Sequence, residues 1–112
     1  MRNICVLIVW ISLLSSCHWQ EAKQVISLAD SLDQTEHVLY DDTAALQQAI
    51  YTLDNPFGHL FAHNELGKAH YYIGRHFSLA DQITQAAEHY IAADRAQIDD
   101  PIYRGRINSC MA

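Results

Sequence analysis

Histidine is the residue of this sequence with the plainest capacity for chemistry, with seven copies in 112 residues. His59 and His63 stand four residues apart in a stretch with helical spacing. Two imidazoles spaced in this way project from one face of a helix and can hold zinc or copper when further ligands complete the shell. The metalloprotease order His-Glu-x-x-His is absent, because residues 63–67 read HNELG. A hydrated helix face is the simpler interpretation, and a metal site is the alternative.

Paired carboxylates are the other candidates for catalysis. Asp41-Asp42 and Asp99-Asp100 have the acid and base groups for proton transfer, but each pair directly precedes a helical segment. Acidic residues at that place cap a helix and interact favourably with its dipole, which explains both pairs without catalysis. The sequence has no glycine-rich phosphate loop, no Cys-x-x-Cys and no recognisable Ser/His/Asp order. We therefore expect neither an enzyme nor a bound cofactor.

The composition is that of one small folded domain. Half of the residues are apolar and 18% are charged, which is ordinary for a chain that buries a core. The formal charge is −6, and the seven lysines and arginines are spread thinly. Binding to nucleic acid needs clustered cations that neutralise phosphates, so nucleic acid is excluded as a partner.

The first sixteen residues differ from the rest. Arg2 gives a positive start, and Ile4 to Leu14 is an apolar run of about eleven residues, whereas a membrane-spanning helix needs about twenty. This pattern predicts a signal peptide over residues 1–16. Leu14-Ser15-Ser16-Cys17 then places small residues and a cysteine at the exit. In this stretch the chain resembles bacterial lipoproteins, whose lipobox has the same order of residue types.

The resemblance implies a lipid anchor. In bacterial lipoproteins the cysteine is joined to diacylglycerol, the signal is removed before it, and the new amino group is acylated, commonly with palmitate. Cys17 is then the lipidated first residue of a mature chain held in the cell envelope, at either the inner or the outer membrane. Several acyl chains, at about 0.8 kcal/mol per buried methylene, make such an anchor firm. With Cys5 removed and Cys17 alkylated, Cys110 has no intramolecular partner and no disulfide framework is expected.

The remaining sequence predicts an all-α fold of antiparallel helical hairpins, because apolar residues recur three or four apart and no alternating run is long enough for a strand. A first helix is expected over about 20–32, so that residues 17–34 form the lipidated N-terminus and first helix, and residues 35–112 the helical module. Asn-Pro and Gly predict a turn over 54–58. The other helices are expected after Asp41-Asp42 as far as Leu53, over 59–79, over 82–98 with Asp81 as N-cap, and from Pro101 to the end.

Small and large residues in the two longest of these helices fall at particular intervals. The pattern is His70-x-x-Ile73-Gly74-x-x-Phe77, then Ala86-x-x-x-Tyr90, then Ala93. It resembles the tetratricopeptide repeat, a helical hairpin of 34 residues, and residues 67–100 accommodate that repeat without a gap. Antiparallel helices approach closely only where small residues stand at the crossing. We therefore expect Gly74 to face Ala86, with the two aromatic residues beside them.

The match to the repeat has three departures. His70 stands where the pattern prefers Trp, Asp81 where the turn commonly has Gly, and Pro101 arrives late. A generic helical hairpin is therefore an alternative. The segment AHYYIGRHF, residues 69–77, is also similar to repeat-bearing bacterial lipoproteins. One repeat with partial flanks buries little surface, so the last helix is a cap, the chain self-associates, or it is a truncated copy of a longer repeat-containing sensor or assembly protein.

The two resemblances imply a membrane-tethered lipoprotein that acts as a non-enzymatic protein-interaction scaffold. In the repeat family the first helix of each hairpin lines a concave face, which takes an extended peptide or a partner helix. The residues expected at that face are Lys68, Tyr71, Tyr72 and Arg75, with the core as the alternative position for Tyr72. The alternative is a histidine-rich, metal-binding periplasmic lipoprotein that uses His59 and His63.

Overall fold

The protein is all-α over the residues that its structure describes, as the sequence predicts. A computed structural model describes the backbone of residues 2–111 and the side chains of residues 18–111. The side chain of Cys17, on which the lipidation prediction depends, lies outside the described residues. The six helices are α1 (Arg2–Thr35), α2 (Thr43–Leu53), α3 (Pro56–Phe61), α4 (His63–Leu79), α5 (Ile83–Arg95) and α6 (Pro101–Met111).

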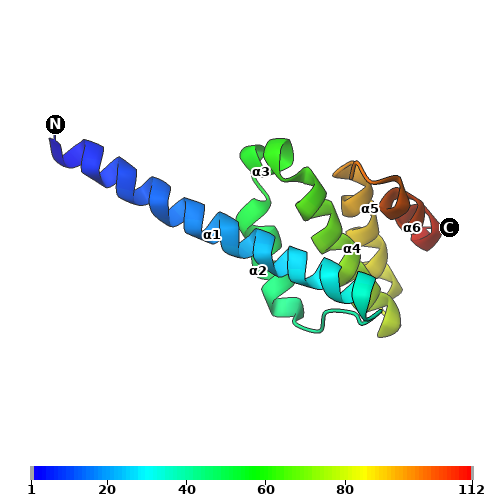
Figure 1. Ribbon diagram of the computed structural model, residues 1–112. Helices are drawn as coiled ribbons and strands as arrows, with labels where there is room; N and C mark the ends of the chain where they lie inside the picture. Colours follow the sequence, from blue (N-terminus) through cyan, green and yellow to red (C-terminus); the bar gives the residue numbers. More distant parts are fainter. Residues whose placement is uncertain (1, 112) are drawn as a thin grey trace.

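The first helix extends well beyond the predicted range of 20–32. The N-terminal part of α1 projects from the body of the molecule, and its C-terminal half packs against α2 and α4 (Figure 1). The molecule is therefore elongated, measuring 56 × 25 × 25 Å. Within the described residues, every helix is too short or too polar to cross a membrane. The signal peptide over residues 1–16 stays a prediction.

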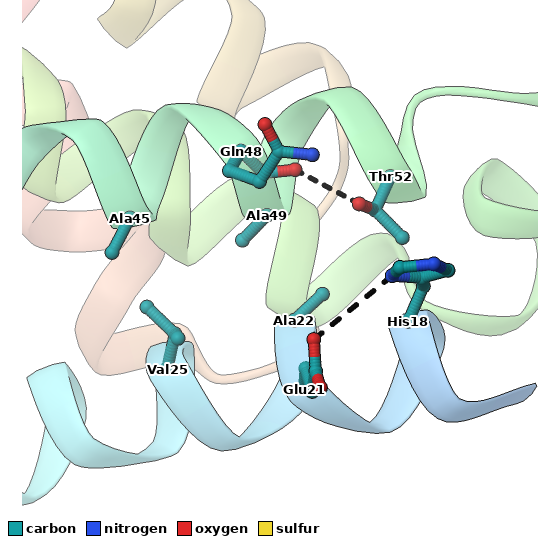
Figure 2. Close-up of a pocket in the computed structure, with 8 residues that line it drawn as sticks. All are labelled: His18, Glu21, Ala22, Val25, Ala45, Gln48, Ala49 and Thr52. Carbon is teal, nitrogen blue, oxygen red and sulfur yellow. Dashed lines mark hydrogen bonds and ion pairs between the residues drawn. The ribbon is translucent and has the colours of Figure 1, made fainter.

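α1 and α2 pack against each other in antiparallel orientation through small side chains. Figure 2 shows His18 near Thr52 at one end of the contact and Val25 near Ala45 at the other. The buried residues between them are Ala22 and Ala49. Small side chains bring the two helices close and leave only a shallow hollow of about 140 Å³. Asp42 caps α2 as predicted, because its side chain accepts a hydrogen bond from Ala45 N at 3.0 Å.

The segment after α2 is a short helix, not only the predicted turn over 54–58. Asn55 is the N-cap of α3, and its Oδ1 accepts a hydrogen bond from Gly58 N at 2.8 Å. Pro56 occupies the first turn, where its missing N–H would have had no helical partner. Gly58 is buried, and a Cβ at this position would overlap the carbonyl oxygen of Leu53. Proline therefore starts a helix here, in addition to ending the one before.

The chain bends at Ala62, between α3 and α4. Ala62 has φ −134° and ψ 30°, outside the helical region, and serves as the end of one helix and the start of the next. The single helix predicted over 59–79 is therefore wrong, and His59 and His63 belong to different helices. The predicted apolar stripe is nevertheless present along α4, where Leu66, Ala69 and Ile73 are buried.

α4 and α5 form an antiparallel hairpin in which a glycine accommodates an aromatic ring. A Cβ at Gly74 would lie 2.7 Å from Tyr90 Cε1, so Gly74 faces Tyr90 and not Ala86 as expected. The reason is that the largest side chain of α5 occupies the site where α4 has no side chain. Asp81 has φ 59°, a left-handed conformation that favours glycine, and it occupies the position at which the repeat pattern commonly has glycine. It does not cap α5, which begins after Gln82.

α5 ends at Arg95, earlier than the predicted range of 82–98. The chain then turns through Gln97, which has φ 56°, and inserts Ile98 against Gly67 of α4. α6 begins at Pro101 as predicted. Its buried residues are Tyr103 and Ile107, whereas Cys110 is exposed. The last helix thus adds two side chains to the core and leaves the rest of its surface open.

Candidate functional site

Polar side chains join three helices along one face of the molecule. The residues concerned are Asp30 and Asp33 from α1, Lys68, Tyr72 and Arg75 from α4, and Tyr103 and Arg106 from α6. We call this set the polar cluster. Its three α4 residues follow the spacing i, i+4, i+7, which places them on one side of that helix. Residues far apart in the chain therefore meet on the α4 face that α1 and α6 cover.

Asp33 is the most buried charge of the polar cluster, with a side chain 10% exposed. Arg75 Nη1 donates a hydrogen bond to Asp33 Oδ1, and Arg106 Nη1 donates to Oδ2, both at 3.0 Å. Each carboxylate oxygen thus has its own guanidinium partner from a different helix. The two arginine side chains are 35% and 45% exposed, so both also reach the surface. Asp33 therefore holds α4 and α6 against α1.

Asp30 organises the second half of the polar cluster. Tyr72 Oη donates to Asp30 Oδ1 at 2.8 Å, and Lys68 Nζ lies 3.4 Å from Oδ2. Because the Tyr72 proton is used in this bond, the Tyr103 hydroxyl donates to Tyr72 Oη at 2.9 Å. Burial, together with the Asp30 hydrogen bond, raises the pKa of Tyr72 far above its ordinary value. The Tyr72 hydroxyl therefore stays protonated and the chain of hydrogen bonds stays intact.

A groove of about 730 Å³ opens beside the polar cluster. Its lining residues are Asp33, His37, Tyr71, Arg75, Ile102, Gly105, Arg106, Ser109 and Cys110. One carboxylate and two guanidinium groups make its wall positive, although the protein carries a formal charge of −6. The groove is also open at Gly105, since no atom of the rest of the fold lies within 4 Å of where a side chain would begin. We refer to this feature as the groove.

The four residues predicted to form a binding face are brought together, but mostly in the interior. Tyr72 is 0% exposed, so it takes the alternative position in the core and its ring does not reach a partner. Tyr71 lines the groove but is only 4% exposed. Lys68 and Arg75 are ion-paired with α1, and Arg75 also lines the groove. The physical reason is that α1 and α6 cover the side of α4 that the sequence leaves without a partner.

Two histidines meet between α4 and α5. His70 Nδ1 lies 3.0 Å from His89 Nδ1, and the His89 ring stacks on Phe77 with 5.4 Å between ring centroids. Burial, together with the neighbouring His89, lowers the pKa of His70 to about 4. Burial also lowers the pKa of His89. At neutral pH the pair is therefore uncharged, and it packs at the place where the repeat pattern has its large aromatic residue.

His59 and His63 do not form the pair considered for a metal. His59 Nε2 lies 2.8 Å from Asp54 Oδ1, and His63 Nε2 lies 3.3 Å from Asp99 Oδ2. The bend at Ala62 places them on separate helices, so the expectation of two imidazoles on one helix face is wrong. Among the side chains of residues 18–111, no group of three or more His, Cys, Asp or Glu is arranged to hold a metal ion.

The acidic side of the polar cluster, Asp30 and Asp33, was not predicted from the sequence. Asp33 continues a buried series on α1 in which the preceding members are Ala22, Ile26 and Ala29. A carboxylate at a position with core spacing requires cationic or hydrogen-bonding partners, because an unpaired buried charge is very costly. That spacing was the available signal. The partners of Asp33 are Arg75 and Arg106, which follow it by 42 and 73 residues in the chain, and no pattern in the sequence indicated them.

Replacing Asp33 with Asn removes the charge that both arginines share. Because the carboxylate is buried while the arginines can regain water, we expect Asp33→Asn to lower the free energy of unfolding by about 1–3 kcal/mol. Urea unfolding followed by circular dichroism measures this. The matched control is Asp94→Asn on the exposed side of α5, expected to change stability by less than about 0.5 kcal/mol. Equal effects of the two substitutions would contradict the central role of Asp33.

The His70–His89 pair predicts a loss of stability in mild acid. In the unfolded chain His70 binds a proton below about pH 6.5, whereas in the folded chain it does so only near pH 4. The unfolded state thus binds more protons in this window, so the free energy of unfolding falls as the pH is lowered, by on the order of 2–3 kcal/mol. His70→Phe should flatten the profile between these values, and exposed His18→Gln should not. Identical slopes in all three proteins would refute the assignment.

No protein-family model, curated protein or solved structure matches this chain. The likeness to lipoproteins therefore rests on Leu14 to Cys17 and the apolar run before them. The likeness to the tetratricopeptide repeat rests on the residue pattern over residues 67–100.

Proposed function

We propose that this protein is a membrane-tethered lipoprotein that serves as a non-enzymatic scaffold, binding a protein or peptide in the groove. The observation that carries the proposal is the placement of α1, α4 and α6 side by side around one open, positively walled groove. In a stack of repeat-like hairpins these three are the first helices of successive units. Their shared face is the one that such scaffolds use for partners.

The chemistry of the groove suits a peptide. Arg75 and Arg106 each use one nitrogen for Asp33 and keep further N–H groups for a second acceptor. The exposed backbone of an extended segment offers carbonyl oxygens, and acidic side chains offer carboxylates. Ile102 adds an apolar contact, since it lines the groove and is 63% exposed. A partner segment with acidic and apolar residues thus fits best.

The tether has its support in the sequence. The small residues before Cys17, and the apolar run of Ile4 to Leu14 before them, provide the elements of a lipoprotein signal. The body that follows is small, and its groove begins no nearer to Cys17 in the chain than Asp33, near the C-terminal end of α1. An anchor at residue 17 would thus hold the protein at a membrane and leave the groove free.

Labelling with radioactive palmitate tests the tether. The full chain, produced in bacteria, should incorporate the label and sediment with membranes, because Cys17 receives the acyl chains. Cys17→Ala should abolish incorporation, while Cys110→Ala, at an exposed cysteine outside the lipobox, should leave it unchanged. Label that persists in Cys17→Ala would refute lipidation at this residue.

Filling the groove tests the scaffold. Gly105→Trp adds an indole at a residue that lines the groove, where a Cβ has no neighbour within 4 Å, and should reduce capture of the natural partner at least about tenfold. Gly105→Ala is the matched control, because it changes the same residue and leaves the groove nearly empty, and it should stabilise α6 by up to about 1 kcal/mol. Affinity capture from the native cells with mass spectrometry compares the three proteins. Unchanged capture by Gly105→Trp would show that the partner does not use the groove.

A further inference from the structure

α3 carries its large apolar side chains on the outside. Phe57, Leu60 and Phe61 are 70%, 66% and 67% exposed. At about 100° per residue, these three positions fall within one arc of about 100° around the helix. Single exposed apolar residues are common on protein surfaces, but three large ones gathered on one helix face indicate a contact surface. We call this surface the α3 face.

The other side of α3 is fixed to the body of the protein. Gly58 lies so close to α2 that a Cβ would overlap the carbonyl oxygen of Leu53. Asn55 Oδ1 accepts a hydrogen bond from Gly58 N at 2.8 Å, and His59 Nε2 lies 2.8 Å from Asp54 Oδ1. The small and polar residues of α3 therefore turn toward the chain itself. The α3 face cannot rotate inward without losing these contacts.

The α3 face is next to the proposed lipid attachment site. α3 lies on the side of the body from which the N-terminal part of α1 projects (Figure 1). His18, the residue after Cys17, lies near Thr52 at the C-terminal end of α2, and α3 begins only a few residues later (Figure 2). Trp19 packs beside the buried Leu53 cluster at the same end. Acyl chains on Cys17 would therefore bring a bilayer to the α3 face.

We propose that the α3 face docks on the surface of the lipid bilayer, with Phe57, Leu60 and Phe61 inserted among the lipids. The inference rests on the proposed function for the anchor at Cys17, which supplies the proximity. Apolar helix faces of this kind enter the boundary between headgroups and acyl chains to a depth of about 5–10 Å. The sequence of α3, PFGHLF, contains no acidic residue, although the whole protein has a formal charge of −6.

The aromatic residues around α3 suit the same boundary. Tyr51 on α2 is 81% exposed and stands five residues before the start of α3, and Trp19 is partly buried and packs against the cluster that contains Leu53. Tyr and Trp are enriched where membranes meet water, because their rings are apolar and their polar atoms remain hydrated. At a lipid surface the apolar α3 face would be buried among lipids, while the polar atoms of the Tyr and Trp rings would remain hydrated.

Fluorescence quenching in vesicles tests the docking. The full chain, purified from bacterial envelopes with Cys5→Ser and Cys110→Ser, receives a single cysteine at position 57, 60 or 61 and the fluorophore NBD at that cysteine. Matched controls place the cysteine at Leu79 or Ile102, which are 75% and 63% exposed and lie on other helices. The vesicles are phosphatidylcholine with doxyl-labelled acyl chains, and iodide is the quencher in water. All five sites are exposed, so the substitutions leave the core intact.

We expect doxyl lipid to quench the α3 positions about fivefold more than the controls, and iodide to show the reverse order. Quenching of the α3 positions by iodide, as strong as at the controls, would overturn the docking even when palmitate labelling confirms the anchor. Protection from both quenchers would also overturn it, because a second protein chain and not lipid would then cover the α3 face. If the chain carries no acyl group, the proposed function fails separately, and the docking is then measured on the same variants with Cys17→Ser added, so that NBD is attached only at the introduced cysteine. Doxyl quenching confined to the α3 positions would still support the docking, and its absence would overturn it.

Discussion

The arrangement of the helices depends on one shared carboxylate, Asp33. It accepts hydrogen bonds from Arg75 of α4 and Arg106 of α6, at 3.0 Å each, across sequence separations of 42 and 73 residues. Removing any one partner leaves a charge poorly paired, so an alternative placement of α6 or α1 would be costly. In a domain this small the apolar core is limited, and such an interaction fixes the relative positions of helices that apolar contacts alone would define less sharply. The groove exists because this ion pair holds its walls.

α4 is the helix on which both halves of the structure converge. One side of α4 contains Gly67 and Gly74. Because these residues have no side chain, Ile98 and Tyr90 pack directly against the α4 backbone, and α5 approaches closely. The other side carries Lys68, Tyr72 and Arg75, which meet α1 and α6 through charge and hydroxyl groups. Close packing thus determines the α4–α5 hairpin, and polar contacts determine the positions of α1 and α6 on the opposite side of α4. These two kinds of contact restrict which side chains fit on either side of α4.

The sequence predicted most helices because each has a local signal. Asp42 caps α2, Pro101 starts α6, and the apolar stripe of α4 has the period of a helix. Prediction failed where tertiary contact decided the outcome: Asn55-Pro56 starts a helix because Gly58 can press against α2, and Ala62 carries no local sign of a bend. The binding face was mispredicted for the same reason. The sequence left Tyr72 open between surface and core, because the outcome depends on α1 and α6, which cover it and whose positions no local pattern specifies.

The two proposed surfaces are compatible with simultaneous use. The α3 face lies at the N-terminal end of α4, whereas Arg75, which lines the groove, lies thirteen residues beyond Ala62 along that helix. At about 1.5 Å per residue this places Arg75 roughly 20 Å along α4 from Ala62, more than the depth to which an apolar helix face enters a bilayer. A protein held at Cys17 and docked through α3 would therefore present the groove to the aqueous side. The same rigid α4 that organises the core would then set the distance between membrane and partner.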